Sequence, residues 1–203
     1  MKVLRKVMEM PWLQPGMPPE EAQAEYSEEH SRRIVLRVFL AVVTSLFFLF
    51  VMAYAERMEL ADWRPVSEPS ILWINTALLV IASIAMQRAR SAADRGVQAL
   101  NNALLAGGLM ALAFLAGQYL AWRQMWAGGY YGLANPAMAF FYLLTVVHGL
   151  HLLGGLYVWG RTLLRSWRGV PVAELRLSIE LCSVYWHYLL LVWLVVFTLL
   201  LNT

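Results

Sequence analysis

The chain has 203 residues, of which 60% are hydrophobic and 14% are charged, and its formal net charge is +3. A soluble domain is nearer ~45–50% apolar and ~25% charged, so this composition excludes a soluble globular chain and a disordered one. The single cysteine, Cys182, excludes a disulfide scaffold and a cysteine-rich zinc or iron–sulfur site. A basic surplus in so apolar a chain is typical of the cytoplasmic loops of a membrane protein, and no nucleic-acid partner is predicted.

Residues 1–33 form a separate N-terminal zone. Residues 11–19 are rich in proline and are not expected to be helical, whereas residues 20–33 are highly charged and helix-prone, so we expect them to continue into the first apolar segment. Residues 1–30 lack the apolar core of a signal peptide. We predict a cytoplasmic N-terminal arm, which is either a plain tail or a docking arm on a partner subunit.

Five apolar segments are long enough to cross a bilayer, which takes about 20 residues. They cover residues 34–54, 70–86, 103–122, 137–160 and 175–201. Short polar connections separate them and hold most of the charges. We therefore predict an all-α, polytopic membrane protein with a five-helix membrane domain over residues 34–203.

The basic residues predict the orientation, because cytoplasmic loops carry an excess of Lys and Arg. With the N-terminus in the cytoplasm, 13 basic residues lie on the cytoplasmic side and 3 on the other. The larger set is Lys2, Arg5, Lys6, Arg32, Arg33, Arg37, Arg88, Arg90, Arg95, Arg161, Arg165, Arg168 and Arg176, and the smaller is Arg57, Arg64 and Arg123. The C-terminus is predicted to lie outside, in the periplasm of a bacterium.

Ionisable and amide side chains within a span are candidates for function, because burying them in lipid is costly. They are Gln118 in the third span, His148 and His151 in the fourth, and Glu180, Ser183 and His187 in the fifth. A rise of about 1.5 Å per residue places Gln118, His148 and His187 in one layer. The spacing within each of the last two spans puts its polar residues on one helix face, so we predict one polar seam between spans four and five.

Three interpretations of this seam remain open. It is a structural hydrogen-bonded seam, a site for protons or lipid headgroups, or a haem or metal site in which His148 and His187 are ligands. A di-iron site would need several inward carboxylates with a Glu-x-x-His pair, and the spans do not carry them. Motifs of soluble enzymes are absent, and the uninterrupted spans give little support to a carrier.

Three runs in successive spans resemble subunit III of the haem–copper oxidases. Residues 117–122 read GQYLAW, residues 140–155 read FFYLLTVVHGLHLLGG, and residues 179–188 read IELCSVYWHY. They are similar to that family's "GQ-x-x-x-W", "FY-x-LT-x-x-HG-x-H-x-x-x-G" and "VEL-x-x-x-YWHF" signatures and occur in the same order. The resemblance is strongest from about residue 101 onward, and five spans correspond to the family's shorter form.

The resemblance implies an integral, non-catalytic subunit of a respiratory terminal oxidase that reduces oxygen and pumps protons in a bacterial inner membrane. Such a subunit carries no cofactor of its own, while haem and copper belong to its partners, the catalytic subunit I and subunit II. It holds phospholipid and supports assembly, sustained turnover and proton uptake. His148, His151, Glu180 and His187 match the family's polar helix residues, and Gln118 matches its glutamine.

Three positions depart from the family pattern. Val43, Ala121 and Leu190 stand where the family usually has acidic residues. Their loss weakens a proton-gathering role and favours assembly and lipid binding. The alternatives are an accessory subunit of a nitric oxide reductase or quinol oxidase and, in a different class, a small haem b membrane protein using His148 and His187.

Overall fold

A computed structural model describes residues 19–64, 69–92, 96–128 and 135–202, with side chains from residue 26 onward. It contains five long helices: α2 (Pro19–Met58), α3 (Ile71–Ala92), α4 (Val97–Ala127), α5 (Pro136–Trp167) and α6 (Val172–Leu201). All five are long and apolar enough to cross a membrane, and the described residues form no strand. The predicted all-α, five-span fold is confirmed, while its orientation in the membrane stays a prediction.

The helices extend beyond the apolar segments from which they were predicted. α3 continues to Ala92, past Arg88 and Arg90, and α5 continues past Arg161 to Trp167. Charged residues at helix ends lie at the level of lipid headgroups, where long side chains reach water and the helix need not stop. The basic residues Lys2, Arg5, Lys6 and Arg95, which contributed to the predicted orientation, lie outside the described residues.

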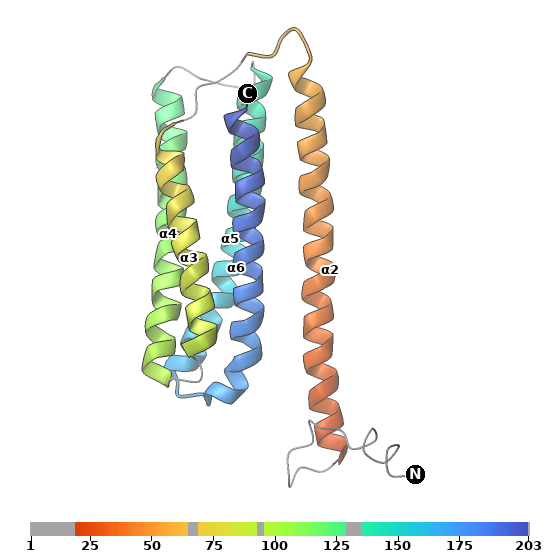
Figure 1. The fold of residues 1–203 in the computed structure, drawn as a ribbon, viewed down its shortest axis with the longest axis vertical. Helices are drawn as coiled ribbons and strands as arrows, with labels where there is room; N and C mark the ends of the chain where they lie inside the picture. The colour runs from red at the N-terminus through yellow and green to blue at the C-terminus, as the bar shows by residue number, and fades with distance from the viewer. Residues whose placement is uncertain (1–18, 65–68, 93–95, 129–134, 203) are drawn as a thin grey trace. The chain divides into compact units, whose positions relative to one another are not determined.

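The chain divides into two compact units, residues 1–42 and residues 43–203. Within the first unit α2 is continuous from Pro19, so the charged segment does lead into the first span as predicted. The functional division at residue 34, between an arm and a membrane domain, stays a prediction. The second unit contains residues 43–58 at the end of α2 together with α3 to α6, and α3 to α6 run alternately up and down beside one another (Figure 1).

Helices α3 to α6 form a ring in which α3 packs on α4 and α6, and α5 packs on the same two helices. Short connections produce this antiparallel neighbour packing. Gly169, with φ of 80°, lies in the left-handed region just after α5, and Pro171 is the residue immediately before α6. At the start of α5, Asn135 Oδ1 accepts a 3.1 Å hydrogen bond from the Ala137 amide, with Pro136 as the first helical residue.

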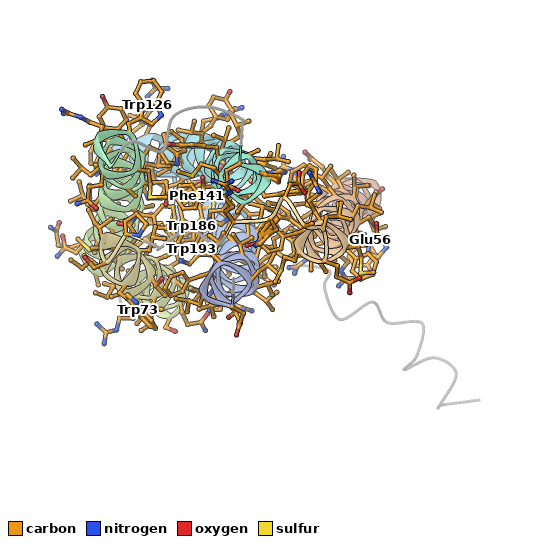
Figure 2. The ribbon with its side chains drawn as sticks, turned by 90° about the horizontal axis from the view of Figure 1, so that it is seen from above. Glu56, Trp73, Trp126, Phe141, Trp186 and Trp193 are labelled. Atoms are coloured by element: carbon orange, nitrogen blue, oxygen red, sulfur yellow. The ribbon has the colours of Figure 1, made fainter. Side chains whose placement is uncertain are left out.

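Aromatic side chains fill the centre of the ring. Trp186 and Trp193 are fully buried and point into the interior of the bundle, whereas Trp126 lies on the outside (Figure 2). Trp159 crosses from α5 to α4, where its Nε1–H donates a 2.8 Å hydrogen bond to the Leu104 carbonyl. It lies against Gly108, where a Cβ atom would come within 2.0 Å of the indole. The glycine thus permits the close α4–α5 contact.

Candidate functional site

Four pairs of polar side chains join α3 to α6, and we call them the polar ladder. The pairs are Arg90 with Glu180, Gln87 with Ser183, Ser83 with His187, and Thr76 with Trp193. From one pair to the next, the residue number decreases on α3 and increases on α6, as expected for two antiparallel helices. Successive members are three, four and seven residues apart on α3 and three, four and six residues apart on α6. Each set therefore shares one helix face.

The four pairs of the polar ladder differ in geometry. Arg90 Nη2 lies 3.6 Å from Glu180 Oε1, and the Ser183 hydroxyl donates to Gln87 Oε1 at 3.2 Å. At the far end the Trp193 indole N–H donates to Thr76 Oγ1 at 2.9 Å. A lipid phase offers no hydrogen-bonding partner, so these contacts satisfy polar groups that would otherwise destabilise the spans.

His187 has one imidazole nitrogen committed to the ladder. Its Nδ1 lies 2.8 Å from the Ser183 carbonyl oxygen, which can only accept, so Nδ1 carries the proton. The same N–H lies 3.2 Å from Ser83 Oγ. In the neutral ring Nε2 is then a hydrogen-bond acceptor. His187 is an exposed residue.

The predicted partner helix for this face was wrong. Glu180, Ser183 and His187 were expected to form a seam with the fourth span, but each of them makes a polar contact with α3. The next helix along the chain was taken as the partner, whereas α6 packs on two helices and turns its polar face to the other one. Sequence reasoning missed Ser83, Gln87 and Arg90, although their i, i+4, i+7 spacing was a usable signal.

The contact between α5 and α6 uses other groups. The Tyr185 hydroxyl donates a 2.9 Å hydrogen bond to the His151 carbonyl oxygen, and Gly155 provides room for the Tyr185 and Trp186 rings. The His151 ring bonds its own helix, with Nδ1 2.8 Å from the Val147 carbonyl oxygen. His151 therefore contributes backbone, not imidazole, to the inter-helix contact with Tyr185.

His148 lies in the bundle core. It is 0% exposed, and its ring centroid is 5.7 Å from that of Phe114 and 5.3 Å from that of Trp193. Neither ring nitrogen has a hydrogen-bond partner among the described residues. Such an orphaned polar group is rare in a protein interior, and it marks His148 as a destabilising element of the core.

Gln118 shares the core with His148. Asn75 Nδ2 on α3 lies 3.5 Å from Gln118 Oε1, while Asn75 Oδ1 and Gln118 Nε2 are unpaired within the described part of the chain. The Trp122 indole bonds Thr145 Oγ1 at 3.1 Å, which fixes the α4–α5 register. The structure therefore places Gln118 and His148 at one level of the bundle interior, while His187 is on its outside.

This arrangement does not support a haem held between His148 and His187. One imidazole packs against two aromatic rings inside the bundle, and the other is exposed and bonded toward Ser83. The two rings do not face a common space that a macrocycle could occupy. Across the described residues, no group of three or more His, Cys, Asp or Glu side chains has the arrangement of a metal site.

An apolar pocket of about 200 Å³ lies between α6 and residues 44–51 of α2. Its lining is Thr44, Phe47, Phe48, Val51, Tyr188, Leu191, Val192, Val195 and Val196. Two of these lining residues, Thr44 and Tyr188, share a 3.0 Å hydroxyl–hydroxyl hydrogen bond. Val43 beside it is buried, as is Ala121 in α4, so two of the usually acidic positions are apolar core here.

The fold and these contacts define an integral membrane protein of five membrane-crossing helices. Comparison with known proteins identifies its relatives. Its sequence is 30% identical over 162 residues to a probable cytochrome c oxidase subunit 3 of Mycobacterium leprae, covering 75% of this chain and 79% of that protein. It is 27% identical over 188 residues to cytochrome c oxidase subunit 3 of Synechocystis, covering 89% and 79%. Cytochrome bo(3) ubiquinol oxidase subunit 3 of Pseudomonas aeruginosa is 26% identical over 137 residues, covering 66% and 65%.

No protein-family model matches the chain. The similarity to the mycobacterial protein nevertheless extends over most of both chains. The chain belongs to the cytochrome c oxidase subunit 3 family. The resemblance predicted from the three sequence runs is confirmed.

Proposed function

We propose that this chain is the non-catalytic subunit III of a haem–copper terminal oxidase, where it supports assembly, holds phospholipid and sustains the turnover of the complex. Membership in the subunit 3 family carries the proposal. The relatives named for a cytochrome c oxidase and for a ubiquinol oxidase share this type of subunit. The catalytic subunit I and subunit II are the proposed partners, and they would hold the haem and copper.

The intramembrane polar groups support a structural role. Glu180, Ser183 and His187 make contacts to α3, and Gln118 makes one to Asn75. These are contacts that fix helix register, which is what a supporting subunit needs. The relative from P. aeruginosa favours a second candidate, the corresponding subunit of a quinol oxidase. The electron donor of the complex distinguishes the two.

The pocket between α6 and residues 44–51 supports the proposed lipid binding. Its lining is almost entirely apolar, which suits an acyl chain. Replacing Val195, which lines the pocket, by Trp would fill it. The adjacent Leu194 is exposed without lining the pocket, so Leu194→Trp is a matched control.

The test is oxygen consumption by the purified oxidase together with its lipid content. We expect Val195→Trp to remove tightly bound phospholipid, seen by native mass spectrometry, and to shorten the period for which the enzyme stays active during turnover. Leu194→Trp should change neither. An oxidase from which this chain has been removed should start at near-normal rate and then lose activity. Unaltered lipid content in Val195→Trp would contradict the lipid role, and undiminished lifetime without the chain would contradict the supporting role.

A further inference from the structure

The least apolar of the five membrane-crossing helices is α3. Its apolar part, residues 71–86, ends before Gln87 and Arg88 and is shorter than the roughly 20 residues that cross a bilayer. It also carries Asn75 and Ser83, whose side chains are buried in the bundle. Placing such polar groups in lipid costs free energy, so α3 by itself is a marginal membrane span.

The polar ladder pairs several polar groups of α3, but its other helix is the last one in the chain. Ser83, Gln87 and Arg90 contact residues of α6, and α4 and α5 separate α3 from α6 in the sequence. A chain is synthesised from its N-terminus onward, so α6 is made after α4 and α5. The polar ladder therefore cannot retain α3 in the membrane while the helices between them are being inserted.

The next helix, α4, begins after a connection of four residues and offers two recesses to α3. The two helices lie side by side, and α3 packs more extensively on α4 than on α6 (Figure 1). At Gly117 of α4 a Cβ atom would come within 2.0 Å of Asn75 Oδ1, and at Gly107 one would come within 2.5 Å of Met86 Cε. The Asn75 amide also lies 3.5 Å from Gln118 Oε1, as its hydrogen-bond donor.

The two glycine recesses hold α3 near both ends of its apolar part. Asn75 and Met86 are eleven residues apart on α3, and Gly117 and Gly107 are ten residues apart on α4, which is about 15 Å along each helix. Glycine at these positions permits the close helix approach on which packing in lipid depends. The residues between the two recesses include the fully buried Leu79, Ala82 and Ala111.

We propose that α3 and α4 are inserted as one helical hairpin, in which α4 retains α3 in the membrane until α6 completes the polar ladder. The recess at Gly117 keeps the Asn75 carboxamide away from lipid, and the recess at Gly107 fixes the other end of the apolar part through Met86. The proposal concerns the assembly of this chain itself. It therefore does not depend on the proposed function.

Two exposed serines near the ends of α3 can report whether this helix crosses the membrane. Ser70→Cys and Ser91→Cys are made in separate full-length chains, and each is treated in membrane vesicles with a thiol reagent that cannot cross the bilayer. The native Cys182 is buried, so it should react little. When α3 spans the membrane, the two introduced cysteines react from opposite sides. When it does not, they react from the same side.

Filling the Gly117 recess should release α3 from the membrane. We expect Gly117→Leu to lower the ratio of spanning to non-spanning chains at least about fivefold, because the added side chain displaces Asn75 from α4. Gly154→Leu on α5 is the matched control. No atom lies within 4 Å of a Cβ at Gly154, so this variant should leave the ratio unchanged.

Further variants separate insertion of α3 from packing of the finished bundle. Ala77 and Gln87 are exposed, so Ala77→Leu combined with Gln87→Leu makes α3 more apolar without filling either recess. Added to Gly117→Leu, this pair should restore the spanning ratio but not the melting temperature of the chain in detergent. Ser183→Ala removes a ladder bond on α6, so it should lower the melting temperature and leave the spanning ratio unchanged.

Three results would overturn the hairpin proposal. A native spanning ratio in Gly117→Leu, with a lowered melting temperature, would show that α3 spans the membrane without the recess. A loss of spanning in Ser183→Ala as large as that in Gly117→Leu would show that α6 retains α3. Failure of Ala77→Leu with Gln87→Leu to restore spanning would show that the low apolarity of α3 is not the reason for its dependence on α4.

Discussion

Glu180 on α6 lies 3.6 Å from Arg90 on α3, so the acidic side chain placed deepest in the predicted spans is paired with a cation of a different helix. The pair is partly buried, with 23% of the Glu180 side chain and 49% of the Arg90 side chain exposed. It stands at the headgroup end of the polar ladder, where both charges can retain contact with water. This placement explains how the spans tolerate a carboxylate.

Removing either partner of this pair should destabilise the contact between α3 and α6. We expect Glu180→Gln and Arg90→Gln each to lower the melting temperature, and the double variant to lose less than the two losses added together. A double-mutant cycle should give a coupling of about 0.5–1 kcal/mol. The Arg165–Glu174 pair, at 3.7 Å with side chains 40% and 61% exposed, is the matched control and should couple less. Equal coupling energies in the two pairs would contradict a stronger stabilising contribution of the Glu180–Arg90 pair.

His148 should be replaceable with a gain in stability. Its ring is fully buried between Phe114 and Trp193, and both nitrogens lack a partner within the described residues. Phenylalanine keeps the ring and removes two buried polar atoms, so His148→Phe should raise the free energy of unfolding by about 1–3 kcal/mol.

The comparison for this variant is His151→Phe. The His151 imidazole bonds the Val147 carbonyl, so its replacement should give no gain. Chemical denaturation of the isolated chain in detergent measures both variants. A loss of stability in His148→Phe would show that the imidazole has a hydrogen-bond partner in the native protein and would contradict this assignment.

Gly108 is the position where helix packing depends most on the absence of a side chain. A Cβ there would come within 2.0 Å of the Trp159 ring, so Gly108→Ala must displace the indole and its bond to the Leu104 carbonyl. We expect a loss of about 1–3 kcal/mol in unfolding free energy. Gly154 has no atom within 4 Å of its would-be Cβ. Gly154→Ala should therefore stabilise α5 by about 0.5–1 kcal/mol, and a loss as large as that of Gly108→Ala would contradict the packing account.

Hydropathy predicted the five spans well because insertion in lipid depends on the length and polarity of single segments, such as residues 137–160 within α5. It did not predict partners, because helix adjacency depends on which faces are complementary. The spacing of Glu180 and His187 predicted that they share one helix face, but the contact of that face with Ser83, Gln87 and Arg90 depends on the ring order of α3 to α6. The same ring order determines that His148 is buried while His187 is exposed.

At the end of α2, Arg57 forms a bidentate pair with Asp62 in the following connection. The hydrogen bond from the Arg57 guanidinium and its charge hold the pKa of the Asp62 carboxyl below its ordinary value of 3.8. A carboxyl with a lowered pKa in the folded state stabilises that state above its unfolded pKa. This contribution is lost as the pH falls through the folded value.

The sequence contains two aspartates, Asp62 and Asp94, so selective isotope labelling of aspartate gives two NMR signals to follow with pH. We expect the Asp62 signal to titrate below 3.8, and Arg57→Gln to return it toward that value. The assignment follows from Asp62→Asn, which removes one signal. A titration of Asp62 that does not respond to Arg57→Gln would show that the pair does not persist in solution.

The central claim is that this chain is a supporting subunit of a haem–copper oxidase, and its most direct test is purification of the tagged wild-type chain from bacterial membranes in mild detergent. A haem–copper catalytic subunit should co-purify, identified by mass spectrometry, and the haem absorption should remain with that subunit when the two are separated. A haem band retained by the separated chain and lost in His187→Ala would show that the chain itself binds haem, and recovery of the chain without any oxidase subunit would show that it is not a subunit of such an oxidase.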